Sequence, residues 1–308
     1  MGQNLQNLLE VSLSMAVAIV PEGLPAVITV TLAIGTQRMV RRAALIHRLP
    51  AVEGLGSVTV ICTDKTGTLT QNRQVVQELR VGTEAVAVTG QGYDPNGRLS
   101  PSPLEPPAGA RPGCTESART MLLQAGVLCS DAELKTQADG SWDILGDPTE
   151  GALVVVAAKA GIDGFALRSR YRRAAEIPFS SERQLMAVWI DDPHCELQDP
   201  LGGCATSSGR LLISKGAPEV IIGLCDRWID GGGVAAMAEE QRQWWLEQAR
   251  ELAASGLRVL AFACAPHHPS PDHHLDDQVL LGLMAQLDPA RPEVATAVAT
   301  CRNAGIRP

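Results

Sequence analysis

The chain is 308 residues long, enough for one large domain or two ordinary ones, and apolar residues make up 45% of it. That share is close to the globular average, so the composition indicates neither a disordered chain nor a polytopic membrane protein. The chain has 26 Lys and Arg against 34 Asp and Glu, a net charge of −8, so no basic surface is available for phosphates and no nucleic-acid partner is expected. The eight cysteines form no C-x-x-C pair, and free thiols are expected.

Residues 11–36 form a long apolar run with Glu22 as its only charge. A run of about 20 apolar residues can cross a bilayer as a helix, and a buried core helix is the alternative. A basic cluster follows directly: Arg38, Arg41, Arg42 and Arg48. Such a cluster marks the cytoplasmic end of a span. We therefore expect an integral protein of the plasma or inner membrane, in contact with lipid, with the residues after about 37 in the cytoplasm.

The motif Pro21–Pro25 interrupts this span. Proline removes a helical hydrogen bond and glycine loosens the backbone, so nearby carbonyl oxygens become available. An acid inside a membrane is costly unless it binds something, and carbonyls with a carboxylate suit a hard cation. A kinked structural helix with a protonated Glu22 is the alternative.

The segment Ser57–Thr63 is rich in β-branched residues and predicts a buried strand, and the polar segment Asp64–Thr70 predicts a loop at its carboxyl end. Ligand sites of open α/β sheets lie at that edge. A carboxylate followed by Lys65, hydroxyl residues and Gly67 suits nucleophilic attack on a phosphoryl group, because a cation and backbone N–H groups can face phosphate oxygens. An ordinary turn residue is the alternative for Asp64.

Residues 73–277 show another pattern, typical of an inserted α+β domain. We predict antiparallel strands, loops and helices in turn: strands Val75–Val81 and Leu185–Ile190, loops Tyr93–Pro112 and Asp191–Gly209, and helices Glu116–Cys129, Glu150–Ala160 and Glu239–Ala254. Ser255 and Gly256 end the last of these helices. A buried apolar run, Val279–Leu287, comes next, and a helix, Pro292–Asn303, is capped by Gly305.

The string Asp64-Lys-Thr-Gly-Thr-Leu-Thr70 resembles the phosphorylation signature of P-type cation-transporting ATPases. The resemblance implies an α/β fold with a partial haloacid dehalogenase-like phosphorylation domain, an inserted α+β nucleotide-binding domain, and one preceding transmembrane helix. It also implies that Asp64 becomes the aspartyl phosphate, that Lys65 and Thr68 contact phosphoryl oxygens, and that Mg²⁺ is held by the Asp64 carboxylate and the Thr66 carbonyl. Soluble phosphatases of that superfamily usually have a second acid where Thr66 stands, so a phosphatase is disfavoured.

Three further strings resemble nucleotide-domain signatures of the same family: Gly146–Leu153, Ile177–Arg183 and Lys215–Glu219. The resemblance implies an ATP site formed by Glu150 at the adenine end, Phe179 stacked on adenine, Lys215 with Gly216, and Arg258 at the β-phosphate. The alternatives are a core aromatic for Phe179, a solvated turn lysine for Lys215 and a helix-end charge for Arg258. The family commonly has a lysine where this chain has Gln184, which removes a positive charge from the pocket.

Two other segments also carry the resemblance. Pro21–Pro25 resembles the fourth membrane helix of the calcium-pump-like branch, which implies a site with the Glu22 carboxylate and backbone oxygens of Val17, Ala18 and Val20. Leu287–Pro292 resembles the hinge at which the chain returns to the phosphorylation domain, with Asp288 as a structural or phosphate-side acid. One histidine group is expected to be a solvated linker rather than a metal site: His267, His268, His273 and His274.

The expected domains are a membrane helix with a cytoplasmic stalk, the first segment of the phosphorylation domain, the nucleotide-binding domain and the start of the second phosphorylation segment: residues 1–48, 49–72, 73–277 and 278–308. The family's T-G-D and G-D-G-x-N-D loops do not occur in this sequence. The chain is therefore expected to be a truncated product, a fragment, or one part of a split pump, with the actuator domain and remaining membrane helices on another chain. By itself, the chain is expected neither to transport an ion nor to phosphorylate itself.

These observations lead to one expected function. The chain belongs to a pump that uses ATP and Mg²⁺, forms an aspartyl phosphate, and moves a hard cation, Ca²⁺ in the first place. A pump for Mn²⁺, Na⁺ or H⁺ is the alternative within the family. An inactive nucleotide-binding module is the alternative from another class.

Overall fold

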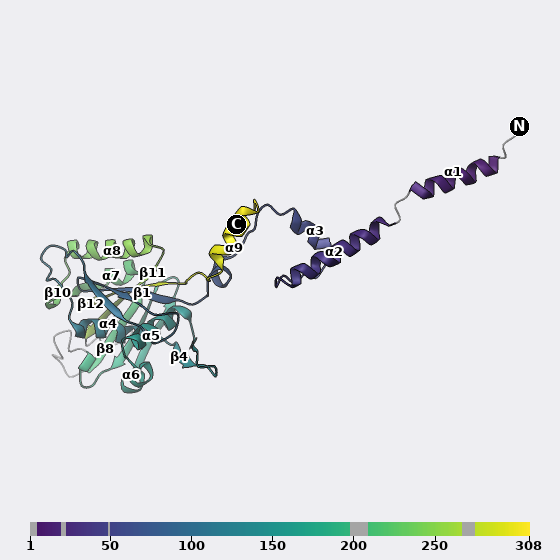
Figure 1. Ribbon diagram of the computed structural model, residues 1–308. Coiled ribbons are helices and arrows are strands. Elements are labelled where there is room, and N and C mark those ends of the chain that lie inside the picture. The colour runs from purple at the N-terminus through teal and green to yellow at the C-terminus, as the bar shows by residue number, and fades with distance from the viewer. Residues whose placement is uncertain (1–4, 20–22, 49, 198–208, 267–274) are drawn as a thin grey trace. The chain divides into compact units, whose positions relative to one another are not determined.

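The computed structural model describes residues 5–19, 23–48, 50–197, 209–266 and 275–308 (Figure 1). The chain divides into two compact units. One comprises residues 1–63 together with 292–308, and the other comprises residues 64–291.

Helices make up most of the described part of the first unit. Its helices are α1 (Leu5–Ile19), α2 (Leu24–Val40), α3 (Pro50–Gly56) and α9 (Val294–Asn303). Within the described residues, the stretch Asn7–Val40 is the one that is long and apolar enough to cross a membrane, and none of its described residues is buried. In α2, the hydroxyls of Thr29 and Thr31 each donate to the carbonyl four residues earlier at 2.8 Å, which satisfies them within the helix.

Ser57–Thr63 does not form the buried strand that its β-branched residues predict, so that prediction is wrong. The segment makes one parallel bridge, Val60 to Arg307, flanked by two backbone hydrogen bonds of 2.9 Å. Val60 is 53% exposed and Ile61 is 40% exposed. Strands of a parallel sheet are normally buried between neighbours on both sides, and in the described part of the chain this segment pairs on one side alone.

The second unit is built on a ten-stranded sheet with the order β3-β2-β1-β12-β11-β8-β7-β6, to which β9 is added beside β12 and β10 beside β9. Its strands are β1 (Val75–Val81), β2 (Glu84–Val88), β3 (Leu99–Pro103), β6 (Arg173–Ser180), β7 (Leu185–Asp191), β8 (Arg210–Gly216), β9 (Cys225–Asp230), β10 (Gly233–Ala236), β11 (Arg258–Pro266) and β12 (Gln278–Leu287). All pairings in this sheet are antiparallel except that of β9 with β12. The strands β4 (Glu133–Thr136) and β5 (Trp142–Leu145) form a separate hairpin.

Helices cover both faces of the sheet (Figure 1). One face carries α4 (Glu116–Leu128), α5 (Pro148–Lys159) and α6 (Gly164–Arg170), and the other carries α7 (Pro218–Gly223) and α8 (Glu239–Ala254). Alternation along the strands divides the apolar side chains into two cores. Met186 and Ile213 face the α4–α5 side, whereas Trp189 and Leu212 face the α7–α8 side.

Most predicted elements of this unit are confirmed, including both antiparallel strands and the three helices, with ends that differ by at most two residues. Two predictions differ from the structure. The predicted loop Tyr93–Pro112 contains β3, because Leu99–Pro103 pairs along β2 as an edge strand, where proline is tolerated. Free thiols are confirmed at six cysteines of the described residues, but the expectation is wrong at Cys195, which is disulfide-bonded.

The strand β12 begins at residue 278, where the sequence predicts a domain boundary. It lies between β1 and β11, pairs with β11 along most of its length and with β1 along residues 283–287, and is therefore a central strand of the sheet. Residues 278–291 and residues 64–72 therefore pack within the same compact unit as residues 73–277. Backbone hydrogen bonding on two sides is the physical reason.

Candidate functional site

Lys215 lies on β8, on the sheet face that α4 and α5 cover. Its Nζ donates to Glu150 Oε1 at 2.6 Å and to Ser130 Oγ at 3.4 Å. The Lys215 side chain is 8% exposed and that of Glu150 is 17% exposed. A solvated turn lysine, the alternative that the sequence allows, does not agree with this burial.

Glu150 is held at both of its carboxylate oxygens. It lies in the first turn of α5, where the Asp147 side chain caps the helix by accepting from Thr149 N at 2.8 Å. Asp131 N donates to Glu150 Oε2 at 2.7 Å, while Lys215 occupies Oε1. The partial positive charge at the amino end of a helix also favours a carboxylate there. Glu150 is therefore fixed in position and ionic.

Gly216 is required by a close approach of the backbone. A Cβ at this position would meet the carbonyl oxygen of Gln184 at 2.3 Å and Leu185 Cα at 2.9 Å. The turn between β6 and β7 thus lies directly against the lysine signature, and Ala217 N donates to Gln184 O at 2.9 Å. Gln184 has a φ of 55°, the left-handed region that side chains other than glycine seldom adopt.

Phe179 lies on β6 and is 57% exposed, so it is not a core aromatic. Ile177 pairs with Ala187 and Ser180 pairs with Leu185, so two residues of β6 oppose Met186 alone. This bulge directs Phe179 to the face opposite its neighbour Ser180, which is the face of Met186. Met186 pairs with Lys215, so the ring and the ammonium group belong to the same face of the sheet.

Arg258 is the first residue of β11 and is exposed. Its Nη1 donates to Thr149 Oγ1 at 3.3 Å, and Thr149 precedes Glu150 in the first turn of α5. This contact brings a fourth segment of the chain to the amino end of that helix. Carboxylate, ammonium and guanidinium groups from distant segments thus converge at one helix terminus.

Asp64 begins the predicted loop, and the structure shows a tight turn there rather than regular helix. Residues Lys65–Leu69 contain non-helical backbone at Thr66 and at Gly67, where φ is 75°. The Thr70 hydroxyl accepts from Gly67 N at 3.2 Å, and Thr70 N donates to Lys65 O at 3.1 Å. Asp64, Lys65, Thr66 and Thr68 are all exposed.

Asp288 joins the segment that precedes β1 to the segment that follows β12. Its Oδ2 accepts from Thr70 Oγ1 at 2.5 Å, and its Oδ1 accepts from Arg73 N at 3.1 Å. Arg291 Nη2 adds a bond of 3.0 Å to Gly67 O. Asp288 therefore links the segment Thr70–Arg73 to the end of β12, and the loop that follows Asp64 is tied to residues 288–291.

Two cations are implied by the resemblance, and both call for oxygen donors. The Asp64 carboxylate and the Thr66 carbonyl are donors of the kind that Mg²⁺ binds together with substrate phosphates and water. The described residues contain no group of three or more His, Cys, Asp or Glu that could hold a metal by itself. The Asp64 loop thus fits a Mg²⁺ ion that arrives with a nucleotide better than it fits a resident ion.

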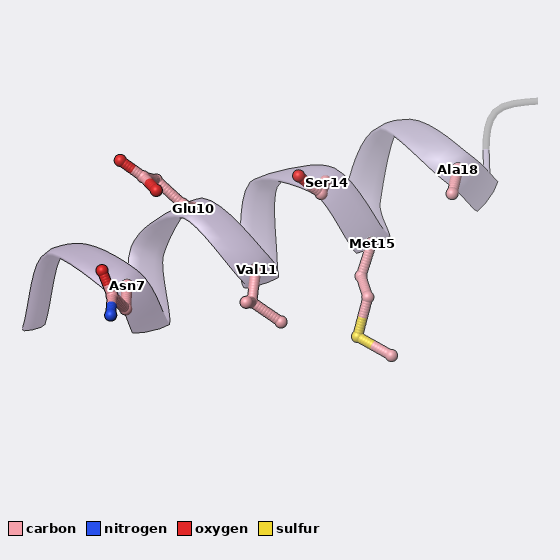
Figure 2. Close-up of a pocket in the computed structure, with 6 residues that line it drawn as sticks. All are labelled: Asn7, Glu10, Val11, Ser14, Met15 and Ala18. Atoms are coloured by element: carbon pink, nitrogen blue, oxygen red, sulfur yellow. The ribbon is translucent and has the colours of Figure 1, made fainter. Parts of the chain in front are cut away.

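Val17 and Ala18, two of the expected cation ligands, lie in the last turn of α1. Carbonyl groups in the last turn of a helix lack intrahelical donors, which leaves them available as ligands. Figure 2 shows Ala18 at this end of α1, beyond Ser14, and both residues line a pocket along the helix. Glu22 and Val20 lie outside the described residues, as do the histidines at 267, 268, 273 and 274.

Sequence reasoning missed Asp147, Ser130 and Asp131 as parts of the site. The spacing of Asp147 and Glu150, an N-cap acid followed three residues later by glutamate, is a helix-start signal that could have identified the first. Ser130 and Asp131 follow the helix α4 without a motif of their own. Their contacts to Lys215 and Glu150 come from residues far away in the sequence.

Comparison with known proteins identifies a matching family and several relatives. The family described as P-type ATPase, cytoplasmic domain N, matches residues 119–293. The chain is 40% identical over 303 residues to the cation-transporting ATPase pma1 of Synechocystis, covering 96% of this chain and 31% of that protein. It is 36% identical to the calcium-transporting ATPase of Bacillus subtilis, covering 99% and 33%. It is also 36% identical to the human calcium-transporting ATPase type 2C member 1, covering 99% and 30%.

The chain thus spans about a third of the length of the relatives it matches. The matches run over the helices, the Asp64 loop and the sheet alike, since they cover nearly all of this chain. The chain belongs to the P-type ATPase family.

Proposed function

We propose that this chain is the ATP-binding and phosphoryl-accepting part of an ATP-driven cation pump. The observation that carries the proposal is the convergence of Lys215, Glu150 and Arg258 at the amino end of α5. Glu150 and Lys215 come from two separate signatures and Arg258 comes from a third segment of the chain, and a merely structural role does not require cations and an acid to meet on the sheet face of an exposed aromatic ring. The relatives named above are cation- and calcium-transporting ATPases.

ATP is bound on the α4–α5 face of the sheet. The Phe179 ring stacks on the base, and base stacking on an aromatic side chain contributes about 1–3 kcal/mol. The Glu150 carboxylate and the Lys215 ammonium provide an acceptor and a donor beside the base. Arg258 provides the cation for a phosphate. Gln184 provides no charge, so the affinity for ATP is modest.

Asp64 accepts the γ-phosphoryl group. A bond forms between a carboxylate oxygen of Asp64 and the γ-phosphorus while the bond from that phosphorus to the β-bridging oxygen breaks, and ADP leaves. Lys65 and Thr68 contact the phosphoryl oxygens, and the Asp64 carboxylate and the Thr66 carbonyl would hold Mg²⁺, which would supply charge neutralisation. Because Thr66 is not an acid, no side chain at that position activates water, and the aspartyl phosphate persists.

The surrounding segments complete the pump in this proposal. Residues 49–72 and the residues after the sheet form part of a haloacid dehalogenase-like phosphorylation domain. The stretch that contains α1 and α2 crosses the membrane once, as a single span, with the residues after about 37 in the cytoplasm. Glu22 and the backbone oxygens of Val17, Ala18 and Val20 bind Ca²⁺. An actuator domain and further membrane helices complete the machine.

Two substitutions in the complete pump test the proposal. Asp64→Asn is expected to abolish hydroxylamine-sensitive labelling from γ-labelled ATP, because an amide does not accept the phosphoryl group. Glu22→Gln is expected to leave ATP binding intact and to weaken the ion-dependent steps, because it removes a charged ligand and keeps the shape of the side chain. Labelling that survives Asp64→Asn refutes the role of Asp64.

Transport assays with different ions decide the cation. Stimulation by Ca²⁺ supports the proposal, and stimulation by Mn²⁺, Na⁺ or H⁺ alone transfers it to another pump of the family. ATP binding without any labelling in the complete pump would instead favour a nucleotide-binding module with no enzymatic activity.

A further inference from the structure

The turn that follows α4 is held by two arginines from another part of the chain. The helix ends without glycine, and Cys129 occupies its C-cap, so several carbonyl groups at this end lack backbone donors. Arg168 donates to Val127 O at 3.1 Å, to Ser130 O at 2.8 Å and to Ala132 O at 2.9 Å. The guanidinium group of Arg168 therefore spans the whole turn.

Arg173 holds the same turn from the β6 side. Its Nη2 donates to Leu128 O at 3.0 Å and to Ser130 O at 3.2 Å, so the Ser130 carbonyl accepts from both arginines. Its Nη1 pairs with Asp131 Oδ1 at 2.7 Å. The carboxyl end of a helix carries partial negative charge, which two guanidinium groups offset. The result is a turn with both its backbone and one side chain fixed.

This turn is also the wall of the ATP site. Asp131 N donates to Glu150 Oε2 at 2.7 Å, and Ser130 Oγ accepts from Lys215 Nζ at 3.4 Å. A displacement of the turn by one ångström would break the first bond and leave Glu150 held by Lys215 alone. The hydrogen bonds of the two arginines to this region go to the turn and not to Glu150 or Lys215, so their geometric influence on the site passes through Ser130 and Asp131, beside a direct Coulombic interaction of Arg168 with Glu150.

We propose that Arg168 and Arg173 are positioning residues for the nucleotide, which hold the Ser130–Asp131 turn so that it orients Glu150 and Lys215. The inference rests on the proposed ATP-binding function. A role in capping α4 is the competing account, because it explains the carbonyl contacts equally well. The two accounts differ in one respect: positioning acts through Glu150, whereas capping acts on the stability of the helix.

A double-mutant cycle on the 308-residue chain separates them. ATP affinity is measured for the unmodified chain, Arg173→Lys, Glu150→Gln and the double variant, together with the free energy of unfolding. Lysine keeps the charge of Arg173 but lacks the planar fork that reaches Ser130 O and Asp131 together. Arg172→Lys is the matched control, because Arg172 is the exposed neighbour in the sequence.

We expect Arg173→Lys to weaken ATP binding about tenfold, within the range of coupling between residues of one network, and to have almost no further effect once Glu150 is glutamine. If the double variant loses ATP affinity by the product of the two single-variant factors, the positioning account is refuted and the capping account is favoured. If the unmodified chain binds no ATP, the proposed function fails first, which is a different result.

A second variant covers the case in which Arg173→Lys does not fold. Asp131→Ala removes an exposed partner of Arg173 while keeping the backbone N–H that bonds to Glu150. We expect a loss of affinity of several fold that again disappears in the Glu150→Gln background. An unchanged affinity in Asp131→Ala overturns the inference.

Discussion

Replacing either partner of the Lys215–Glu150 ion pair tests whether the site is as buried as the structure shows. The perturbations are Lys215→Met and Glu150→Gln, alone and together. Methionine keeps most of the length of the lysine side chain, and glutamine keeps the shape of glutamate, so packing changes little. Each single change leaves one buried group without its charged partner, and the double change removes both charges.

The magnitude follows from the geometry of the pair. At the observed 2.6 Å, and with an effective dielectric constant of about 20, the attraction is on the order of 6 kcal/mol before desolvation is subtracted. Removing one partner of a buried pair costs about 3–5 kcal/mol. We expect the low end, about 3 kcal/mol for each single variant, because Asp131 N still holds Glu150 and Ser130 Oγ still accepts from Lys215. The double variant is expected to cost clearly less than the sum.

Chemical unfolding followed by tryptophan fluorescence measures these costs. Lys135→Met is the matched control, because Lys135 pairs with Glu133 at 3.1 Å while their side chains are 56% and 53% exposed. An exposed pair of this kind contributes less than about 1 kcal/mol. If Lys215→Met costs no more than Lys135→Met, water screens the pair and the description of a buried, fixed site is wrong.

Four further changes test other features. Phe179→Ala is expected to weaken ATP binding by about 1–3 kcal/mol with little loss of stability, since the ring is 57% exposed; a loss of stability with unchanged ATP affinity would return the ring to the core. Gln184→Lys should tighten ATP binding through the restored charge and leave the melting temperature nearly unchanged, because both residues pay the same cost at a φ of 55°; flat affinity with a lower melting temperature would show that the side chain packs elsewhere. Asp288→Ala removes both hydrogen bonds to the segment that precedes β1 and should cost about 2 kcal/mol and accelerate amide exchange at residues 70–73, and unchanged exchange there contradicts these contacts. Lys159→Met should raise stability at neutral pH by about 1 kcal/mol, because the Lys159 Nζ is buried and has no hydrogen-bond partner in the described part of the chain. Burial lowers the pKa of Lys159 from 10.5, so the unfolded chain binds more protons there and the stability of the unmodified chain rises with pH towards that value; the variant should lack this rise, and a less stable variant would contradict the reasoning.

The helices and strands of the second unit were predictable because their signals are local. The helix α8 begins and ends where the sequence predicts, since its periodic apolar face runs to Ala254 and Gly256 follows with a φ of 80°. The strand β1 likewise has the predicted bounds. The Asp64–Thr70 string and the nucleotide-domain strings resemble family signatures, so the family could be named from the sequence, and the comparisons confirm the family.

Pairing between distant segments decided the rest, and no local pattern encodes it. The apolar runs Ser57–Thr63 and Val279–Leu287 look alike in sequence, yet the first makes a single bridge and the second becomes the strand β12 between two neighbours. The difference lies in which partner strands each run meets, and that depends on the whole chain.

For the candidate site, too, some features could be predicted from the sequence and others depended on the tertiary structure. Residue types at Lys215, Glu150, Phe179 and Arg258 could be selected from the sequence, because their motifs are contiguous. The bulge that turns Phe179 to the face of Lys215 depends on the register of β6 against β7, and the Ser130–Asp131 turn depends on guanidinium groups about forty residues away along the chain. Sequence thus determined which chemical groups the site contains, and tertiary structure decided their direction and their neighbours, because hydrogen-bond geometry exists only between segments that folding has brought together.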